Sequence, residues 1–245
     1  MIETIQPGAL YVVSTPIGNL DDITLRAIRI LGSVDLVAAE DTRKTKFLMD
    51  HLGIKKPLLS YYSYNEARRI PELISKLKSG SSVAVVTDAG TPGISDPAFL
   101  IIENAIQHGF RVIPVPGASA VLPALIASGL PTDRFVFEGF LPLKKGRKKR
   151  LEQLRSEERT IIIYESPFRI ERTLEDILTH IGDRPVAVAR ELTKKFEEVV
   201  RGNASEVLDE IRKKKTKGEF VLIVAGTRSV APDRITEEKA LTNHP

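Results

Sequence analysis

The segment that most constrains the fold of this chain is residues 83–97, VAVVTDAGTPGISDP. Four apolar residues end abruptly in a loop that contains two aspartates, two glycines and two prolines. An apolar run this short before turn residues is typical of a buried strand in a parallel sheet. Parallel sheets occur almost only in α/β proteins, in which helices cover the faces of the sheet. The sequence around this segment is therefore expected to alternate strands and helices.

Apolar runs and helical patterns do alternate through the first half of the chain. Runs that predict strands occupy 9–14, 35–38, 58–61, 83–87 and 111–115. The clearest helical pattern follows the third run, where Ile70, Leu73, Ile74 and Leu77 repeat at i, i+3, i+4 and i+7. This alternation predicts a parallel sheet covered by helices, and the ligands of such sheets bind beyond the carboxyl ends of the strands.

The second half begins after a boundary marked by Pro114, Pro116 and the small residues 117–120. Strands are predicted at 134–137, 160–164, 186–190 and 220–225, with a short further strand near 197–201 and a helix between Pro167 and Ile181. Short turns between neighbouring strands predict that part of this sheet is antiparallel. The second half is therefore expected to contain a mixed sheet.

Several classes of chemistry lack the residues that they need. The 245 residues include no cysteine, which excludes disulfides, thiolate metal sites and a cysteine nucleophile. The four histidines are scattered without metal-ligand spacing, so we predict no metal site. Neither G-x-S-x-G nor G-x-G occurs, which argues against a serine hydrolase and a standard dinucleotide-binding loop. Because no signal pattern or membrane-length apolar run is present, we expect a soluble, cytoplasmic protein that makes no membrane contact.

The loop after the fourth strand run has the features of a ligand site. Gly90 and Gly93 allow the backbone to approach a ligand closely, while Asp88 and Asp96 make the end of the strand negative. A phosphate-binding loop would carry a lysine there, so this loop favours amines, hydroxyls or a positive centre. The alternative is an ordinary turn in which Asp96 and Pro97 only start the next helix.

Two further motifs follow predicted strands. The segment EDTR places Glu40, Asp41 and Arg43 after a buried strand, where they either cap a helix or handle a proton and orient a substrate. The segment PGASA, 116–120, opens a helix with small residues. It serves either close helix–strand packing or the binding of a carboxylate or ribose oxygen by free N–H groups.

Charge is concentrated in one run, KKGRKKR, although the net charge is only +4. Its six basic residues are Lys144, Lys145, Arg147, Lys148, Lys149 and Arg150. Such a run is either a solvated face or a surface that contacts RNA phosphates. A second basic patch comprises Lys213, Lys214, Lys215 and Lys217. Because no RNA-binding module signature is present, RNA would be recognised by shape and charge.

Six segments, in order along nearly the whole chain, resemble one protein family. They are STPIGNLDDITLRA (14–27), AAEDTR (38–43), TDAGTPGISDP (87–97), PVPGASA (114–120), YESPFR (164–169) and GEFVLIVAG (218–226). The chain resembles the ribosomal RNA small subunit methyltransferase I family, which belongs to the tetrapyrrole-methylase-like, or class III, S-adenosylmethionine-dependent methyltransferases. The DAGTPGISDP and EDTR motifs are specific to this branch, whereas PGASA is shared more widely.

The resemblance implies an α/β fold of two α/β domains with the cofactor in the cleft between them. We expect an N-terminal domain with a mostly parallel sheet at 1–116, a C-terminal domain with a mixed sheet at 117–228, and a polar tail at 229–245. The implied cofactor is S-adenosyl-L-methionine. The implied activity is 2'-O-methylation of a cytidine in the decoding region of 16S ribosomal RNA in the small ribosomal subunit, by a homodimer.

Functional residues are carried over by position from the same resemblance. The implied cofactor-binding residues are Pro16, Asp88, Gly90, Gly93, Ile94, Asp96, Ser119, Ala120, Tyr164, Leu192, Ala225 and Gly226. Our hypothesis for the chemistry is that Glu40 or Asp41 orients or deprotonates the ribose hydroxyl while Arg43 neutralises a phosphate. The basic residues of 144–150 are predicted to bind RNA.

Two other functions remain open at this point. One is methylation of a tetrapyrrole ring by a member of the same superfamily, and the other is a non-catalytic RNA-binding factor in ribosome assembly. The basic run favours RNA over a tetrapyrrole, and binding of the methyl donor would argue against a pure binding module.

Overall fold

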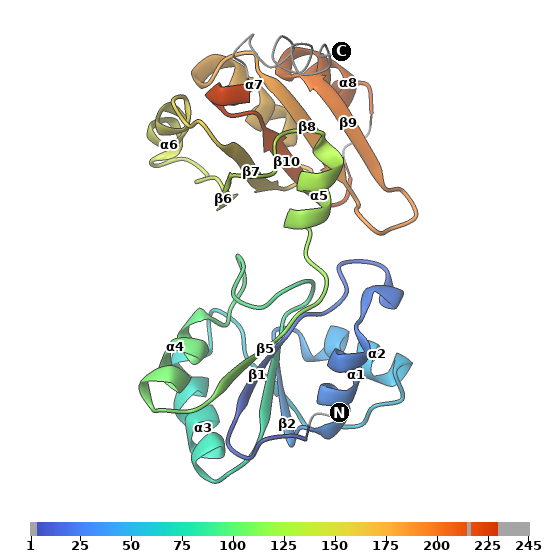
Figure 1. Ribbon diagram of the computed structural model, residues 1–245, viewed down its shortest axis with the longest axis vertical. Helices are drawn as coiled ribbons and strands as arrows, with labels where there is room; N and C mark the ends of the chain where they lie inside the picture. Colours follow the sequence, from blue (N-terminus) through green and yellow to red (C-terminus); the bar gives the residue numbers. More distant parts are fainter. Residues whose placement is uncertain (1–3, 215–216, 230–245) are drawn as a thin grey trace, which may run out of the picture. The chain divides into compact units, whose positions relative to one another are not determined.

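The computed structural model describes residues 4–214 and 217–229, and the chain divides into two compact units, Met1–Ser119 and Ala120–Pro245 (Figure 1). The predicted domain limits of 1–116 and 117–228 stay a prediction. The predicted polar tail at 229–245 lies, apart from Ser229, outside the described residues. None of the described helices is long and apolar enough to cross a membrane.

The first unit contains a five-stranded sheet in which every pair of neighbouring strands is parallel. Its order is β3-β2-β4-β1-β5, with β1 Leu10–Val13, β2 Leu36–Ala39, β3 Leu58–Ser60, β4 Val83–Val86 and β5 Val112–Val115. The helices are η1 Leu20–Asp22, α1 Leu25–Ser33, α2 Thr42–His51, α3 Glu66–Lys78 and α4 Phe99–Gln107.

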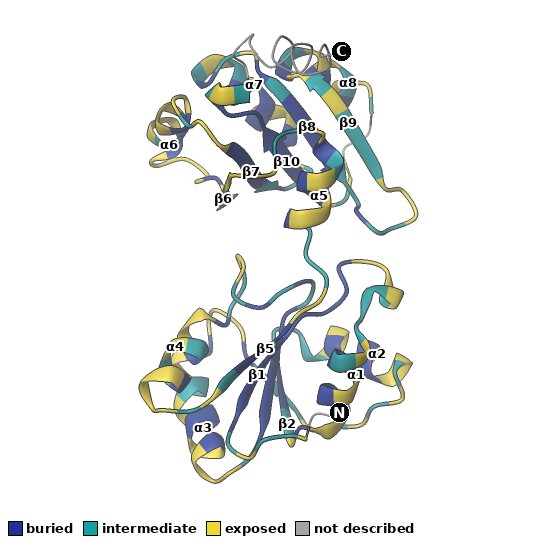
Figure 2. Ribbon diagram, viewed as in Figure 1, coloured by how far each residue is buried: buried dark blue, intermediate teal, exposed yellow. Residues whose placement is uncertain are grey.

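Both faces of this sheet are covered, which explains why its central strands β1, β2 and β4 are apolar throughout. Successive side chains of a strand point to opposite faces. Leu10 of β1 packs in one core cluster with Leu73 of α3, whereas its neighbour Tyr11 packs in the other with Ile30 of α1. The central strands β1 and β4 are accordingly buried throughout, whereas the edge strands β3 and β5 are buried only in part (Figure 2).

The second unit contains a mixed five-stranded sheet of order β6-β7-β10-β8-β9. The strands are β6 Phe135–Phe140, β7 Thr160–Glu165, β8 Pro185–Arg190, β9 Glu198–Asn203 and β10 Phe220–Val224. Only the β6–β7 pair is parallel; β10 runs antiparallel to both β7 and β8, and β9 antiparallel to β8. The predicted α/β fold with one parallel and one mixed sheet is confirmed.

The helices of this unit are α5 Val121–Ser128, α6 Arg147–Leu154, α7 Ile170–His180, α8 Ala204–Arg212 and η2 Thr227–Ser229. Leu151 of α6, Leu174 of α7 and Leu208 of α8 share one core cluster with the sheet, and α5 contacts β8 and β10. The helix expected between Pro167 and Ile181 begins at Ile170 because 166–169 form a turn before it.

Candidate functional site

The carboxyl ends of β1, β4 and β5 meet at Gly90. Thr15 after β1 and Gly90 after β4 exchange two backbone hydrogen bonds, of 2.9 Å and 3.0 Å, in an isolated antiparallel bridge. Gly90 has a φ of 83°, which a residue with a side chain rarely adopts. A Cβ placed there would lie 3.4 Å from Ile17 and 3.8 Å from the carbonyl oxygen of Ala118. The glycine therefore lets three loops approach one another.

Hydroxyl groups hold the loop after β5 against the loop after β1. The Ser14 and Thr91 hydroxyl oxygens lie 2.9 Å apart, and Thr91 Oγ1 donates to the carbonyl of Ala118 over 3.3 Å. A Cβ on Gly117 would lie only 2.9 Å from Cβ of Ser14, so the PGASA segment needs glycine at that position. The segment therefore packs closely against the loop after β1, while the predicted helix–strand packing and ligand binding by its N–H groups stay predictions.

Reciprocal hydrogen bonds join the ends of the adjacent strands β2 and β4. The Asp88 N–H donates to Glu40 Oε2 over 3.1 Å, and the Asp41 N–H donates to Asp88 Oδ1 over 3.0 Å. Lys44 Nζ donates to the other oxygen of Asp88 over 2.8 Å. The carboxylates of Glu40 and Asp88 are thus oriented by backbone donors, and Lys44 partly neutralises Asp88.

Asp41 is the N-cap of α2, so the helix-capping interpretation of EDTR is confirmed. Its Oδ1 accepts from the backbone N–H of Arg43 over 2.9 Å, and the Arg43 guanidinium donates to both carboxylate oxygens over 3.1 Å and 2.7 Å. These hydrogen bonds from Arg43 hold the pKa of Asp41 well below its usual range. Asp41 therefore stays ionised near neutral pH and has little tendency to take up a proton.

Asp96 has the opposite environment. Burial, together with the negative charges of Glu40 and Asp88, raises its pKa to about 6. The hydroxyl of Thr87 donates one hydrogen bond of 3.4 Å to the carboxylate, which acts in the opposite direction and lowers the pKa. Among the described residues, no lysine or arginine forms an ion pair with Asp96. A partly buried carboxylate without a cation attracts a positively charged ligand. Asp96 is therefore the strongest sign of a ligand site in this unit.

Most of the predicted site residues of the first unit lie in these loops. Pro16 is buried, Ile94 is 41% exposed, and Gly93 lies between Asp88 and Asp96. Ser119 is half-buried in the segment after β5. Sequence reasoning missed Lys44 and the hydroxyls of the site; the position of Lys44, three residues after Asp41 on α2, was a readable signal. Within the described residues, no group of three or more His, Asp or Glu could hold a metal ion.

The predicted cofactor-binding residues of the second unit do not form one cluster. Tyr164 pairs with Val221 in the β7–β10 ladder, and its ring contacts Phe137 and Phe140 at centroid distances of 4.9 Å and 5.7 Å. The half-buried Ala120 begins this unit, and the buried Leu192 follows β8 at the same end of the sheet as Tyr164. Ala225 and Gly226 follow β10 at the opposite end.

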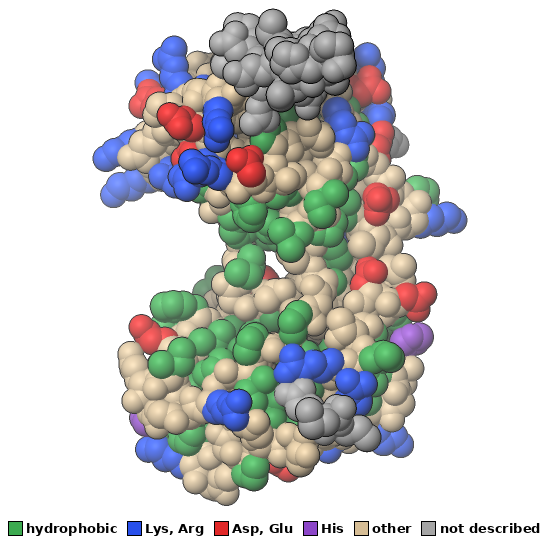
Figure 3. All heavy atoms as spheres, in the orientation of Figure 1, with side chains coloured by type: hydrophobic (Ala, Val, Ile, Leu, Met, Phe, Trp, Pro, Cys, Tyr) green, Lys and Arg blue, Asp and Glu red, His purple; other side chains and the backbone are tan. Residues whose placement is uncertain are grey.

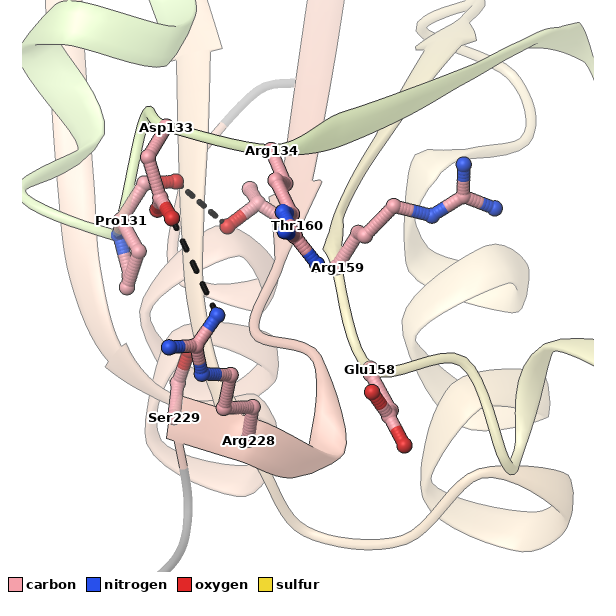
Figure 4. Close-up of a pocket in the computed structure, with 8 residues that line it drawn as sticks. All are labelled: Pro131, Asp133, Arg134, Glu158, Arg159, Thr160, Arg228 and Ser229. Carbon is pink, nitrogen blue, oxygen red and sulfur yellow. Dashed lines mark hydrogen bonds and ion pairs between the residues drawn. The ribbon is translucent and has the colours of Figure 1, made fainter.

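Gly226 has a packing role at that opposite end. A Cβ on it would lie 2.1 Å from the carbonyl oxygen of Glu158. The adjacent hollow is lined by Pro131, Asp133, Arg134, Glu158, Arg159, Thr160, Arg228 and Ser229 (Figure 4). Its volume of about 20 Å³ holds little more than one water molecule. This hollow is too small for a nucleoside.

The basic run 144–150 is only partly a free surface. Arg147 is 4% exposed; its guanidinium donates to Asp176 over 2.7 Å and to Thr173 over 2.8 Å. Arg150 donates to both carboxylate oxygens of Glu138 over 2.6 Å. The structure thus assigns packing roles to these two arginines, because their donors already have protein partners.

The remaining members of the run, Lys144, Lys145, Lys148 and Lys149, are exposed, and of these Lys148 forms a surface ion pair with Glu152 over 3.7 Å. Figure 3 shows Lys and Arg side chains gathered on the surface around α6. In the second basic patch, Lys213 pairs with Glu210 and Lys214 with Glu198, while Lys215 lies outside the described residues. The RNA-binding prediction therefore rests on the four lysines of the first run.

Comparison with known proteins places this geometry in a class. The family model of the tetrapyrrole (corrin/porphyrin) methylases matches residues 9–208. A solved structure of uroporphyrin-III C-methyltransferase from Thermus thermophilus, complexed with S-adenyl homocysteine, has a TM-score of 0.62 and 20% identity and covers 89% of this chain and 97% of its own. The fold and the loops at the carboxyl edge of the parallel sheet define a protein of the tetrapyrrole methylase class.

Curated relatives narrow the class further. A ribosomal RNA small subunit methyltransferase I from Thermotoga maritima is 48% identical over 89% of this chain and 99% of its own length. The protein of the same name from Halalkalibacterium halodurans is 49% identical over 93% of this chain and 80% of its own. The chain belongs to the tetrapyrrole methylases and, within them, to the ribosomal RNA small subunit methyltransferase I family.

Proposed function

We propose that this protein uses S-adenosyl-L-methionine to methylate 16S ribosomal RNA, at the 2'-hydroxyl of a cytidine in the decoding region. The names of the relatives support an RNA substrate in the small ribosomal subunit. The S-adenyl homocysteine complex of the Thermus thermophilus structure supports the donor. The observation that carries the proposal is the partly buried carboxylate of Asp96, which lacks a described cation partner.

The loops of the first unit suit the donor chemically. The donor carries a sulfonium, an ammonium and ribose hydroxyls, all of which are attracted to carboxylates. Asp96 supplies a carboxylate with no described cation partner, Gly93 is half-buried in the same loop, and Gly90 holds that loop against Thr15. Pro16, Ile94 and Ser119 lie in or beside the same loops and complete the proposed donor site in this unit. Ala120, Tyr164, Leu192, Ala225 and Gly226 stay predictions.

The transfer needs orientation more than acid–base chemistry. When bound, the donor supplies an electrophilic methyl group, whose C–S bond breaks as the ribose oxygen forms its O–C bond and loses its proton. The pKa of Asp41 is too low for its carboxylate to retain that proton. We propose that this carboxylate accepts a hydrogen bond from the ribose hydroxyl and orients the hydroxyl while the proton passes to water. Glu40 positions Asp88, and Arg43 fixes Asp41 through Nε and Nη2. The Arg43 side chain is otherwise exposed, and we propose that its Nη1 contacts a neighbouring phosphate.

The exposed lysines of the basic run are proposed to bind RNA phosphates. A variant with Lys144, Lys145, Lys148 and Lys149 replaced by glutamine should bind RNA more weakly, with a flatter dependence on salt. Its thermal unfolding should match that of the wild type because these side chains are exposed. An unchanged salt dependence would remove this part of the proposal.

We further propose that the enzyme acts as a homodimer in the cytoplasm, where small subunits are assembled. Leu122 and Ile126 lie one turn apart on α5 and are 52% and 73% exposed, an apolar surface that a second copy can cover. Light scattering of the purified protein tests this, and a monomer at micromolar concentration would contradict it.

The test of the activity is incubation with labelled donor and small ribosomal subunits that lack the modification, followed by nucleoside analysis. We expect the label in 2'-O-methylcytidine of the 16S RNA. Label in another nucleoside of the 16S RNA would still support an RNA methyltransferase but would overturn the assignment of cytidine as the target. Label only in an added tetrapyrrole, or none anywhere, would overturn the proposed function.

A further inference from the structure

The outer face of α2 combines basic side chains with an exposed aromatic ring. Arg43, Lys46, Phe47 and Asp50 are spaced i, i+3, i+4 and i+7, which places them on one side of the helix. Phe47 is 67% exposed. A phenylalanine this exposed has no packing role in its own unit. On this face it lies beside Arg43 and Lys46, each of which forms an ion pair with an aspartate. An exposed ring next to basic side chains is typical of surfaces that stack a nucleobase and bind the adjoining phosphates.

The same face ends in a hollow of about 140 Å³, which has room for several water molecules. Three lysines, Lys46, Lys55 and Lys56, line it together with the apolar side chains of Met49, Ile54 and Leu58. Lys46 pairs with Asp50, also in the lining, over 3.1 Å. In the described ranges no ion pair involves Lys55 or Lys56, although Lys56 interacts electrostatically with Asp35.

This hollow stands apart from the site described above but is connected to it by one rigid element. Asp41, at the candidate site, caps the first turn of α2, whereas Lys46, Met49 and Asp50 from the rest of the helix line the hollow together with residues after its end. A helix of 10 residues is about 15 Å long, so the two ends of α2 can contact different nucleotides of one RNA strand.

We propose that the outer face of α2 and this lysine-lined hollow form an RNA-binding surface that is separate from the basic run 144–150. Lys55 and Lys56 bind phosphates of the RNA backbone at the hollow, and Phe47 stacks on a base between the hollow and the candidate site. The inference rests on the proposed function, because it takes ribosomal RNA as the substrate. Positive charge, an exposed ring and apolar walls together match a nucleotide better than a free phosphate ion.

The first test compares two double variants of the full-length protein. Lys55→Gln/Lys56→Gln removes the two lysines of the hollow that form no ion pair, and Lys76→Gln/Lys78→Gln removes two exposed lysines from the end of α3 as a matched control. Binding to a 16S RNA transcript is measured without methyl donor over a series of salt concentrations. Loss of two phosphate contacts should lower the slope of log K against log salt by about 1.5, with no such loss in the control.

The second test concerns the ring. Phe47→Ala should weaken binding to the same transcript about tenfold without changing the salt slope, whereas Phe47→Trp should retain binding. Ile106→Ala removes a similarly exposed apolar side chain from the end of α4 and should have no effect. Thermal unfolding of every variant confirms that the fold is intact.

The outcomes separate this inference from the proposed function. Equal RNA affinities and salt slopes for the hollow variant and its control would overturn the inference, even if the wild type methylates RNA. An unchanged RNA affinity of the Phe47→Ala variant would also overturn the inference, and the exposed ring would then be assigned to contact with a protein partner. Failure of the wild type to transfer methyl groups would overturn the proposed function, while a selective loss of RNA binding in these variants would still support the surface.

Discussion

Replacing Asp96 by asparagine is predicted to stabilise the protein at neutral pH. Burial and the charges of Glu40 and Asp88 raise the pKa of Asp96 from its ordinary 3.8 to about 6. Each pKa unit corresponds to about 1.36 kcal/mol, which sets an upper value of about 3 kcal/mol for the cost of the ionised form. Because Asp96 is only partly buried, we expect about 2 kcal/mol in practice. Asparagine has a similar shape and carries no charge, so it removes this cost.

The pH dependence has a definite sign. A folded state with a raised carboxyl pKa binds the proton more tightly than the unfolded chain. The contribution of this tighter proton binding to the free energy of unfolding is fully present below pH 4 and is lost as the pH rises through about 6. The Asp96→Asn variant has no such titration. Its advantage over the wild type should therefore be absent near pH 4, grow between pH 4 and 6, and remain constant above.

Denaturant unfolding at pH 4, 5, 6 and 7.5 measures this difference. Asp35→Asn is a suitable control in the same unit, because two hydrogen bonds from Ser82, each 2.7 Å, lower the pKa of Asp35. That variant should lose stability at neutral pH. Calorimetry with S-adenosyl-L-methionine should show a large loss of affinity for Asp96→Asn. An Asp96→Asn protein that is less stable than the wild type at pH 7.5, or whose advantage does not vary with pH, would refute the reasoning.

Three further changes have definite expected outcomes. Asp41→Asn keeps a capping oxygen but removes the charge, so the rate of single-turnover methyl transfer should fall about 100-fold while the donor Kd stays within about twofold. An undiminished rate would contradict the orienting role of Asp41. Arg147→Met should lower the free energy of unfolding by about 2 kcal/mol, because it removes the buried hydrogen bonds to Asp176 and Thr173 while Arg172 still pairs with Asp176. Lys148→Met on the same helix should change it by less than about 0.5 kcal/mol, and equal effects would contradict the packing role. Gly117→Ala places a Cβ 2.9 Å from Cβ of Ser14, which forces the loop after β5 to shift, so calorimetry should show weaker binding of the methyl donor. An unchanged donor Kd would argue against this loop as part of the site.

The alternation of strands and helices could be predicted because buried strands and amphipathic helices leave different periods in the sequence. The strand order could not. Glu40 and Asp88 are far apart in the sequence, and they meet only because β2 and β4 are neighbours in the sheet. The sequence predicted that these carboxylates lie at one edge of the sheet, but it did not show that Lys44 pairs with Asp88 while Asp96 has no described cation partner.

Charged runs were the weakest part of the sequence-based reasoning. Arg147 and Arg150 stand in a run that predicts a fully exposed basic surface, yet Asp176 and Glu138 bind their guanidinium groups. These partners come from other elements, so local composition carries no sign of them. Likewise, only the antiparallel register shows that Tyr164 and Gly226 lie toward opposite ends of β10.

The central claim is that the loop after β4 receives the methyl donor beside Asp96. A crystal structure of the full-length protein with S-adenosyl homocysteine tests it most directly. The account predicts that the nucleoside lies against Gly90 and Gly93 with polar atoms within hydrogen-bonding distance of Asp96. A ligand bound elsewhere, with the Asp96 carboxylate facing only protein atoms, would contradict it.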